Sequence, residues 1–240
     1  ADLATGKRSV KLRDALPKLR EVKRMVDAAD GATFEKCMRL AVDLFNNLFR
    51  DRILALTSKF PKDFVTKDGE AFWSGAKRFP LAADLDLDNE QHMSFLIAAT
   101  NILSANFGVT PLPEEAMVPL GDEKRDPAYF KRTLEAAPPA AAFKRRKSVE
   151  LAMAAEVDMD DDKDAEVKEA TDEDAAEVAD LLKQLRSRHV TDIRIAPADF
   201  EKDQDLNFHI DFITAASNLR ATNYHIKTAS RHTCKMIAGK

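Results

Sequence analysis

The sequence predicts a mainly α-helical protein: an irregular helical domain with a minor short-stranded β element and a long charged insertion. Three observations support this prediction. Gly and Pro number only seven and ten in 240 residues, so the chain has few helix breakers. Apolar residues recur at three-and-four spacing in several windows. One of these helical windows is also repeated later in the chain.

The composition narrows the possible classes of protein. A hydrophobic content of 45% with 32% charged residues is ordinary for a globular domain, and 240 residues can bury one large core or two small ones. The net charge of −4 gives no reason to expect nucleic-acid binding. No apolar run approaches the ~20 residues needed to span a bilayer.

The first elements are read from apolar spacing. Residues 1–8 show no pattern and are expected to be loose, whereas residues 9–28 have helical spacing. Pro17 interrupts that spacing, so a short helix, a turn and a second helix are expected before Asp30 and Gly31 end the segment.

A long helix should follow. Thr33 is a good N-cap residue, and a wide apolar face runs over residues 34–56 until Phe60 and Pro61 stop it. Cys37 lies on this face, and no His or acid accompanies it at an activating spacing. It is interpreted as a buried, inert cysteine.

Residues 61–85 are expected to form an ordered loop with a turn at 67–69. The run 72–80 interleaves aromatic and basic residues, a pattern that single-stranded nucleic-acid sites also use. The simpler interpretation is that Phe72, Trp73 and Phe79 plug the loop into the core, with Lys77 and Arg78 at its rim.

The repeat joins residues 86–107 to residues 203–224, aligned without a gap. The positions shared by the two copies are Asp86/Asp203, Asp88/Asp205, His92/His209, Phe95/Phe212, Ala98/Ala215, Ala99/Ala216, Asn101/Asn218 and Asn106/Asn223. Such density predicts two equivalent helices, which we expect to pack through their Ala-Ala faces.

The repeated Asp-x-Asp-x-x-x-His has two interpretations. Two copies could supply six metal ligands. Alternatively, Asp88 caps the first helix with Gln91 completing a capping box, Asp205 precedes the second, and His92 and His209 are buried and hydrogen-bonded. The structural interpretation is preferred, and no metal ligand is assigned.

Residues 110–191 are expected to be a charged variable insertion, partly disordered, between the two parts of a helical core formed by 1–109 and 192–240. Within it, 126–136 could form a short helix. The acid-rich run 156–180 is expected to be solvated and to leave 144–171 open to proteolysis. The basic run 144–147 could be a nuclear-import or polyanion signal, but pairing with these acids or solvation is preferred.

The last elements follow the insertion. Residues 172–188 regain helical spacing, with acids first and basic residues last, as the helix dipole favours. Residues 193–195 alternate and could form a short strand, and 229–237 form a final amphipathic segment. Both chain ends look cut, so a piece of a longer protein is expected.

Chemical motifs are absent from the sequence. It contains no Gly-rich phosphate loop, no G-x-S-x-G, no H-E-x-x-H and no Cys/His dyad. Cys37 and Cys234 have neither CxxC nor Cys/His spacing, which fits a reducing compartment and argues against a disulfide or a zinc site.

Two stretches carry a family resemblance. Residues 72–80 (FWSGAKRFP), and above all 200–224 together with 235–240 (KMIAGK), closely resemble ubiquitin-activating enzymes in their second catalytic cysteine half-domain. The resemblance covers roughly 33–109 and 195–240, and 110–191 does not follow it.

The resemblance implies an activity for the parent enzyme. Members of the family adenylate ubiquitin with ATP and Mg²⁺, capture it as a thioester on a cysteine and pass it to a ubiquitin-conjugating enzyme, in the cytoplasm and nucleus. A thiolate suits this step because it is nucleophilic near neutral pH. Ubiquitin or a ubiquitin-like protein, the conjugating enzyme and the adenylation domain of the same chain are the implied partners. Neither nucleic acid nor a membrane is implied.

The chain departs from the family at the reactive cysteine. The family places it in a Cys-Thr context before the segment that begins here, and neither Cys37 nor Cys234 matches it. No catalytic, cofactor-binding or metal-binding residue is therefore assigned, and no cofactor is expected in this fragment, which should be inert alone. The alternative is a free-standing helical interaction module that reuses this half-domain.

Overall fold

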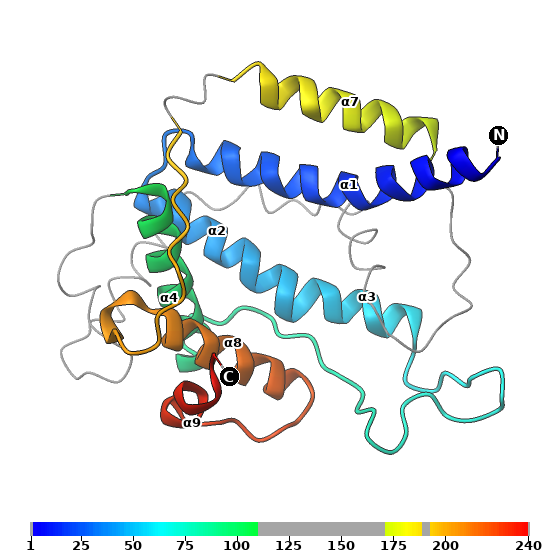
Figure 1. Cartoon of the computed structure of the whole chain (residues 1–240). Coiled ribbons are helices and arrows are strands. Elements are labelled where there is room, and N and C mark those ends of the chain that lie inside the picture. Colours follow the sequence, from blue (N-terminus) through cyan, green and yellow to red (C-terminus); the bar gives the residue numbers. More distant parts are fainter. Residues whose placement is uncertain (1, 110–170, 189–192, 240) are drawn as a thin grey trace. The chain divides into compact units, whose positions relative to one another are not determined.

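The computed structural model describes residues 2–109, 171–188 and 193–239, with side chains described from Ala15 onward. The predicted mainly helical fold is confirmed (Figure 1). The expected helix at 126–136, the basic run 144–147 and the protease-sensitive segment 144–171 lie outside these residues. Two compact units divide the chain, one of Ala1–Gly31 with Asp158–Ile195 and one of Ala32–Val157 with Ala196–Lys240.

The described residues of the first unit form a pair of helices. Helix α1 spans Asp2–Ala29, and α7 spans Asp172–Arg186 alongside it (Figure 1). Arg20 donates two hydrogen bonds to the Glu177 carboxylate, at 2.7 and 2.6 Å, and Arg188 forms ion pairs with Asp27 and Asp30.

Helix α1 corrects the predicted start of the chain. The helix begins at Asp2, so residues 2–8 are helical rather than loose, and it runs through Pro17 without a turn. Proline removes one backbone donor and crowds the preceding turn, but a helix of 28 residues retains the hydrogen bonds on either side. Its predicted end is confirmed, since Gly31 has φ of 58°.

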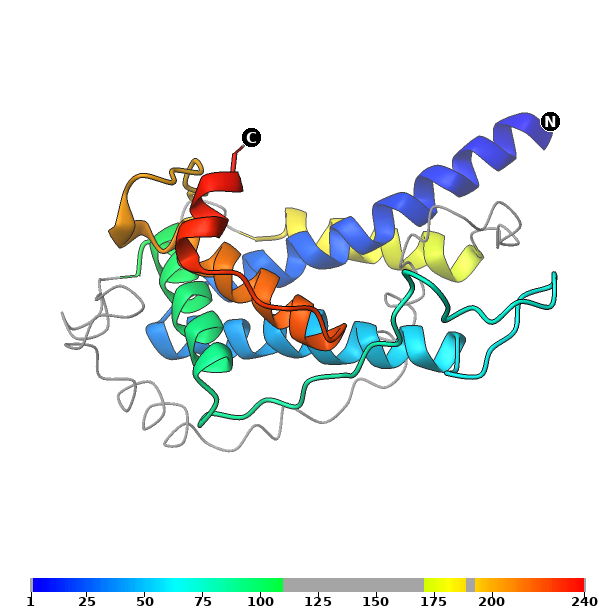
Figure 2. The ribbon, with the colours of Figure 1, turned by 90° about the horizontal axis from the view of Figure 1, so that it is seen from below.

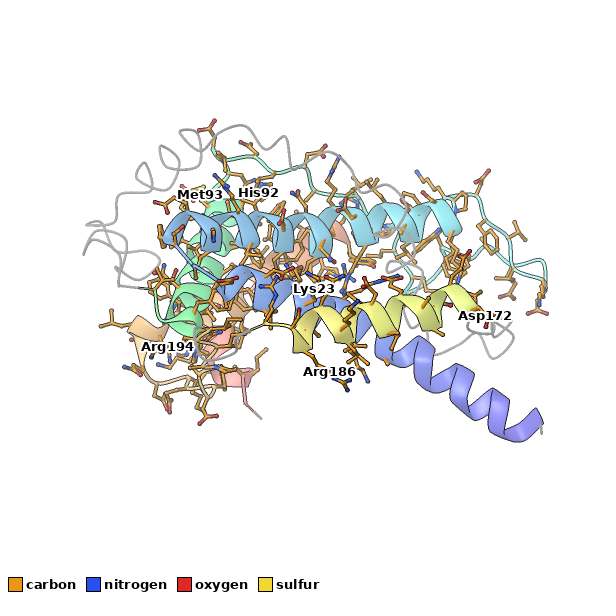
Figure 3. The ribbon with its side chains drawn as sticks, turned by 90° about the horizontal axis from the view of Figure 1, so that it is seen from above. Lys23, His92, Met93, Asp172, Arg186 and Arg194 are labelled. Carbon is orange, nitrogen blue, oxygen red and sulfur yellow. The ribbon has the colours of Figure 1, made fainter. Side chains whose placement is uncertain are left out.

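Helix α7 is built as the sequence predicts. Thr171 accepts from the Asp174 N–H while the Asp174 carboxylate accepts from Thr171, which forms a capping box. Asp172 and Arg186 mark its two ends, with acids first and basic residues last (Figure 3). The proposed domain division at 110–191 stays a prediction, although α7, inside that range, packs on α1.

The second unit begins with one long helical run. Helix α2 (Phe34–Asn46) starts at the predicted N-cap Thr33, whose hydroxyl accepts from the Lys36 N–H. A π-helical turn, η1 (Asn47–Asp51), joins it to α3 (Arg52–Lys59), which ends at Phe60 as predicted. The π turn was not foreseen. In it the Phe49 carbonyl accepts from the Ala83 N–H, at 2.9 Å.

The described part of this unit also contains the α-helices α4 (Glu90–Phe107), α8 (His209–Asn223) and α9 (Arg231–Ile237), the last confirming the predicted final segment. Helix α4 packs against both α2 and α8, and α9 packs against α8 (Figure 2). The buried core lies between these helices, with Phe45, Phe95 and Ala98 fully excluded from solvent.

The expected short strand is not formed, because residues 193–195 are irregular. Among the described residues the β structure is confined to an isolated bridge between Val65 and Ala71, closed by the predicted turn at Gly69. None of the described helices is both long and apolar enough to cross a membrane.

Candidate functional site

The two repeat copies meet at the centre of the second unit. Phe95 of α4 and the equivalent Phe212 of α8 contact each other with ring centroids 5.3 Å apart. Ala98 and Ala99 of α4 and Ala215 of α8 are buried in the core they share. This packing agrees with the expected contact through the Ala-Ala faces, since small side chains let two helix backbones approach closely.

Each copy holds its histidine by the same local hydrogen bonds. The Nδ1 of His92 accepts the Asp86 N–H at 3.0 Å, and the Asp86 carboxylate accepts the Asp88 N–H. In the second copy the Nδ1 of His209 accepts the Glu201 N–H at 3.0 Å. The Glu201 carboxylate then accepts the Asp203 N–H.

The gapless alignment is therefore wrong before the histidines. Structurally, Asp86 corresponds to Glu201 rather than to Asp203, because the second copy inserts the 3₁₀ turn η5 (Asp205–Asn207). The aligned acids do not share a role, which sequence identity alone could not show.

The predicted N-cap at Asp88 is also wrong. Asn89 caps α4, with its side-chain oxygen accepting from the N–H groups of Gln91 and His92. In the second copy Asn207 accepts from the His209 N–H. Both starts use an asparagine, whose short side chain reaches backbone donors two or three residues on.

The asparagine at the end of each copy is hydrogen-bonded to the segment that precedes the other copy. Asn223 donates through Nδ2 to the carbonyls of Phe49 and Leu81, at 3.1 and 2.6 Å, and its carbonyl accepts the Leu81 N–H. Asn106 accepts the Ala198 N–H through its side chain and the Ala196 N–H through its carbonyl. The segment leading into each copy is thus fixed by the end of the other copy.

The histidines differ in burial. His92 is 8% exposed and lies against Phe45, with ring centroids 4.8 Å apart, at the start of α4 (Figure 3). Burial lowers the pKa of His92, opposed by the nearby Asp86 carboxylate. The prediction of a buried histidine holds for His92, but His209 is only half-buried and stacks on Phe200.

A charged cluster joins α8 to α9. Arg231 donates to the fully buried carboxylate of Asp211 at 2.8 Å and to Asp205 at 3.0 Å. Lys235 lies 3.7 Å from Asp203 and 3.6 Å from Asp205. The hydrogen bond to Asp211 raises the pKa of Arg231, and Arg231 lowers the pKa of Asp205.

Sequence reasoning missed this cluster. Arg231 and Asp211 are 20 positions apart on different helices, so no periodicity links them. The sequence did contain one sign of it. Asp211 stands where the first copy has Ser94, and a carboxylate buried on a helix needs a cationic partner.

The two cysteines are structural. Cys37 is 0% exposed on α2 and Cys234 is 3% exposed on α9, which confirms the prediction of a buried Cys37. Burial raises the pKa of the Cys37 thiol, so little thiolate is present near neutral pH.

The aromatic loop forms a small cluster of its own. Phe72 stacks on Phe60 with ring centroids 4.4 Å apart, Trp73 donates its indole N–H to the Phe60 carbonyl, and Lys77 lies over the Phe72 ring. These rings do not belong to the main core, so the expected plug is replaced by local packing beside α3.

Metal chemistry finds no support in the described part of the chain, where no group of three or more His, Cys, Asp or Glu side chains is placed to hold an ion. Of the residues that could have been ligands, Asp86, His92 and His209 instead accept from backbone N–H groups, and Asp203 and Asp205 pair with Lys235 and Arg231.

Fold and site together define a helical domain in which two related helix segments pack on each other. The chain belongs to the family described as "Ubiquitin-activating enzyme, SCCH domain", whose model matches residues 3–235. SCCH denotes the second catalytic cysteine half-domain, so the family resemblance is confirmed.

Similar proteins carry the corresponding names. "Ubiquitin-activating enzyme E1 1" of Schizosaccharomyces pombe is 35% identical over 208 residues, which are 87% of this chain and 19% of the relative. "Ubiquitin-like modifier-activating enzyme 1" of Homo sapiens is 33% identical over 224 residues, 92% of this chain and 19% of the relative. The chain thus spans about a fifth of the length of these relatives.

Proposed function

We propose that this chain is the scaffold part of a catalytic cysteine half-domain in a longer ubiquitin-activating enzyme. The parent would adenylate ubiquitin or a ubiquitin-like protein with ATP and Mg²⁺, capture it as a thioester and pass it to a conjugating enzyme in the cytoplasm and nucleus. The family match over residues 3–235 and the names of the relatives support this proposal.

The observation that carries the assignment of a scaffold role is the burial of both thiols. A thioester-forming cysteine needs an accessible thiolate. Cys37 and Cys234 are 0% and 3% exposed, and the raised pKa of Cys37 opposes its ionisation. The reactive cysteine is therefore proposed to lie elsewhere in the parent enzyme, and this chain is proposed to be inert alone.

The sequence and the described residues give no support for an ATP or Mg²⁺ site in this chain. The sequence lacks a Gly-rich phosphate loop, and the described side chains offer no cluster of metal ligands. We assign nucleotide and metal binding to the rest of the parent enzyme, together with the adenylation step.

The test incubates the chain with ATP, Mg²⁺, ubiquitin and a conjugating enzyme, followed by mass spectrometry with and without reductant. We expect no reducible ubiquitin adduct on this chain and a single adduct on the longer parent enzyme. An adduct that Cys37→Ser or Cys234→Ser abolishes would overturn the scaffold assignment. A parent reading frame of only about this length would favour a free-standing interaction module instead.

A further inference from the structure

Thr171 presents a hydroxyl group at the start of α7 that the proposed function does not use. Its side chain is exposed, and its backbone is extended, with φ of −87° and ψ of 165°. The hydroxyl accepts from the Asp174 N–H at 3.2 Å and donates to the Asp174 carboxylate at 3.1 Å. The same carboxylate accepts from the Thr171 N–H at 2.8 Å. The hydroxyl therefore lies at the protein surface and is held only by the first turn of the helix.

Three acidic residues follow this hydroxyl directly. Asp172, Glu173 and Asp174 occupy the next three positions, and Asp172 marks the start of α7 in Figure 3. The hydrogen bonds from the N–H and the hydroxyl of Thr171 lower the pKa of Asp174, so this carboxylate is charged near neutral pH. No other serine or threonine in the 240-residue sequence is followed by three consecutive acids.

A second threonine has the same local geometry without the acids. Thr33 caps α2, is exposed, and has an extended backbone with φ of −127° and ψ of 164°. Its hydroxyl accepts from the Lys36 N–H at 3.3 Å. The residues after it are Phe34, Glu35 and Lys36, so the third position carries a cation. Exposure and capping are common to both threonines, and the run of acids distinguishes Thr171.

We propose that Thr171 is phosphorylated by a protein kinase with a basic substrate cleft, and that the phosphate opens the capping box of α7. Kinases select acceptors through the charge pattern of the neighbouring residues, and three acids match a basic cleft. The Thr171 Oγ1 attacks the γ-phosphorus of ATP, and an O–P bond forms while the bond from that phosphorus to ADP breaks. The hydroxyl proton passes to a carboxylate of the kinase. This step is independent of the thioester chemistry proposed for the parent enzyme.

The phosphate acts on the capping box through charge repulsion. It carries a charge of about −1.5 to −2 near pH 7. The Asp174 carboxylate lies within hydrogen-bonding distance of the Thr171 hydroxyl, so the two negative groups repel each other and the carboxylate leaves the Thr171 N–H. Asp172, Glu173 and Asp174 already place negative charge at this helix N-terminus, so the added charge brings mainly repulsion.

The turn after the capping box also holds α7 to α1. Glu177, three residues after Asp174, accepts two hydrogen bonds from Arg20 of α1 at 2.7 and 2.6 Å. Arg20 is also close enough to Asp174 to help lower its pKa. Opening of the first turn therefore acts directly beside the ion pair that joins the two helices, and phosphorylation loosens this end of the pair.

The test incubates the 240-residue chain with ATP and a purified casein kinase that selects acids after its acceptor, and maps phosphate by mass spectrometry. We expect phosphate on Thr171 and none on Thr33. Thr171→Ser should still be phosphorylated at this position, because serine keeps the hydroxyl, whereas Thr171→Ala should not. An unmodified Thr171, under conditions in which the kinase phosphorylates its own peptide substrate, overturns the proposal.

A matched pair of variants tests recognition of the acids. Glu173→Gln removes one acid after Thr171 without changing either residue of the capping box. Asp180→Asn removes another exposed acid of the same helix, outside the run. Phosphorylation of Thr171 should slow about threefold in Glu173→Gln and stay unchanged in Asp180→Asn. Equal rates in the two variants would show that the kinase does not read these acids, which overturns the proposal.

Hydrogen exchange with mass spectrometry measures the effect of the phosphate on α7. Amides of residues 174–178 should exchange about fivefold faster in the phosphorylated chain, as expected for the loss of a helix cap. Amides of residues 34–38, at the start of α2, are the control and should be unchanged. Removal of the phosphate by a phosphatase should restore the slow exchange. Phosphate on Thr171 with unchanged or slower exchange of residues 174–178 overturns the opening of the capping box.

Discussion

The two repeat copies share some of their local hydrogen bonds but lie in different surroundings. In both copies the histidine Nδ1 accepts from a backbone N–H that lies earlier in the chain. Both copies also end on an asparagine that is hydrogen-bonded to the segment preceding the other copy. Helix α4 is buried on most of its surface, since α2 and α8 both cover it. Helix α8 has more exposed residues than α4. It also binds α9 through a charged cluster that the first copy lacks.

The difference shows what a repeated sequence encodes. The end of each helix and the bond that holds its histidine are reproduced in both copies, whereas the starts differ because the second copy inserts η5. Burial depends on which other elements pack on each copy. Substitutions at equivalent positions of the two copies therefore separate the local from the tertiary contributions to stability.

The largest effect is expected at the charged cluster that distinguishes the copies. Arg231→Ala leaves the Asp211 carboxylate buried without its cation, so the free energy of unfolding should fall by about 3 kcal/mol. Asp211→Ser installs the residue of the first copy, and the double variant should recover at least half of that loss. Urea denaturation checks both values, with hydrogen exchange of α9 as the local readout. Losses that simply add would show that the two residues are uncoupled.

The next effect compares the two terminal asparagines. Asn223 is 2% exposed and holds two carbonyls, so Asn223→Ala should cost about 2 kcal/mol. Asn106 is half-buried and its side chain accepts one long hydrogen bond of 3.3 Å, so Asn106→Ala should cost about 0.5 kcal/mol. Equal costs in urea denaturation would contradict the asymmetry between the copies.

A smaller effect of opposite sign is expected just after each helix. Gly108 and His225 occupy equivalent positions with φ of 65° and 55°, and the backbone hydrogen bonds beside them match. His225→Gly removes a strained side chain and should stabilise the protein by about 0.5–1 kcal/mol. Gly108→Ala should destabilise it by about 1 kcal/mol. Thermal denaturation measures the stability change of each variant. A loss of stability in His225→Gly would falsify the claim that Gly108 and His225 are equivalent positions.

The smallest effect is a pH slope from His92. Burial lowers its pKa below the ordinary value of about 6.5, so the unfolded chain takes up the proton first as the pH falls. Stability should therefore be complete above about pH 6.5 and decline below it. His92→Asn keeps an acceptor for the Asp86 N–H without titrating, so its urea midpoints between pH 7 and 5 should fall less. Parallel pH profiles for the two proteins would show that His92 does not contribute.

Elements with strong local signals were predictable. The N-cap at Thr33, the stop at Phe60 and the polarity of α7 follow from single residues acting on the adjacent turn. The prediction failed at Pro17, where the helix continues past a local breaker. It also failed at Asp88, where a neighbouring asparagine takes the cap.

Other features required the tertiary structure. The cluster of Arg231 with Asp211 joins separate helices. The side chain of Asn223 bonds Leu81, 142 positions away, and that of Asn106 bonds Ala198, 92 positions away. Apolar spacing reports only one element at a time, so it carries no information on such pairs.

The sequence by itself determined the helical class, the positions of most described helices, the burial of Cys37 and the family. These depend on periodicity, capping and motif identity, which are local in the chain. The tertiary structure decided which acids of the repeat correspond, that the aromatic loop packs beside α3, and that Arg231 of α9 pairs with the buried Asp211 of α8. Each of these depends on which surfaces meet, and hydrophobic burial, being non-directional, specifies that apolar faces are covered but not by which partner.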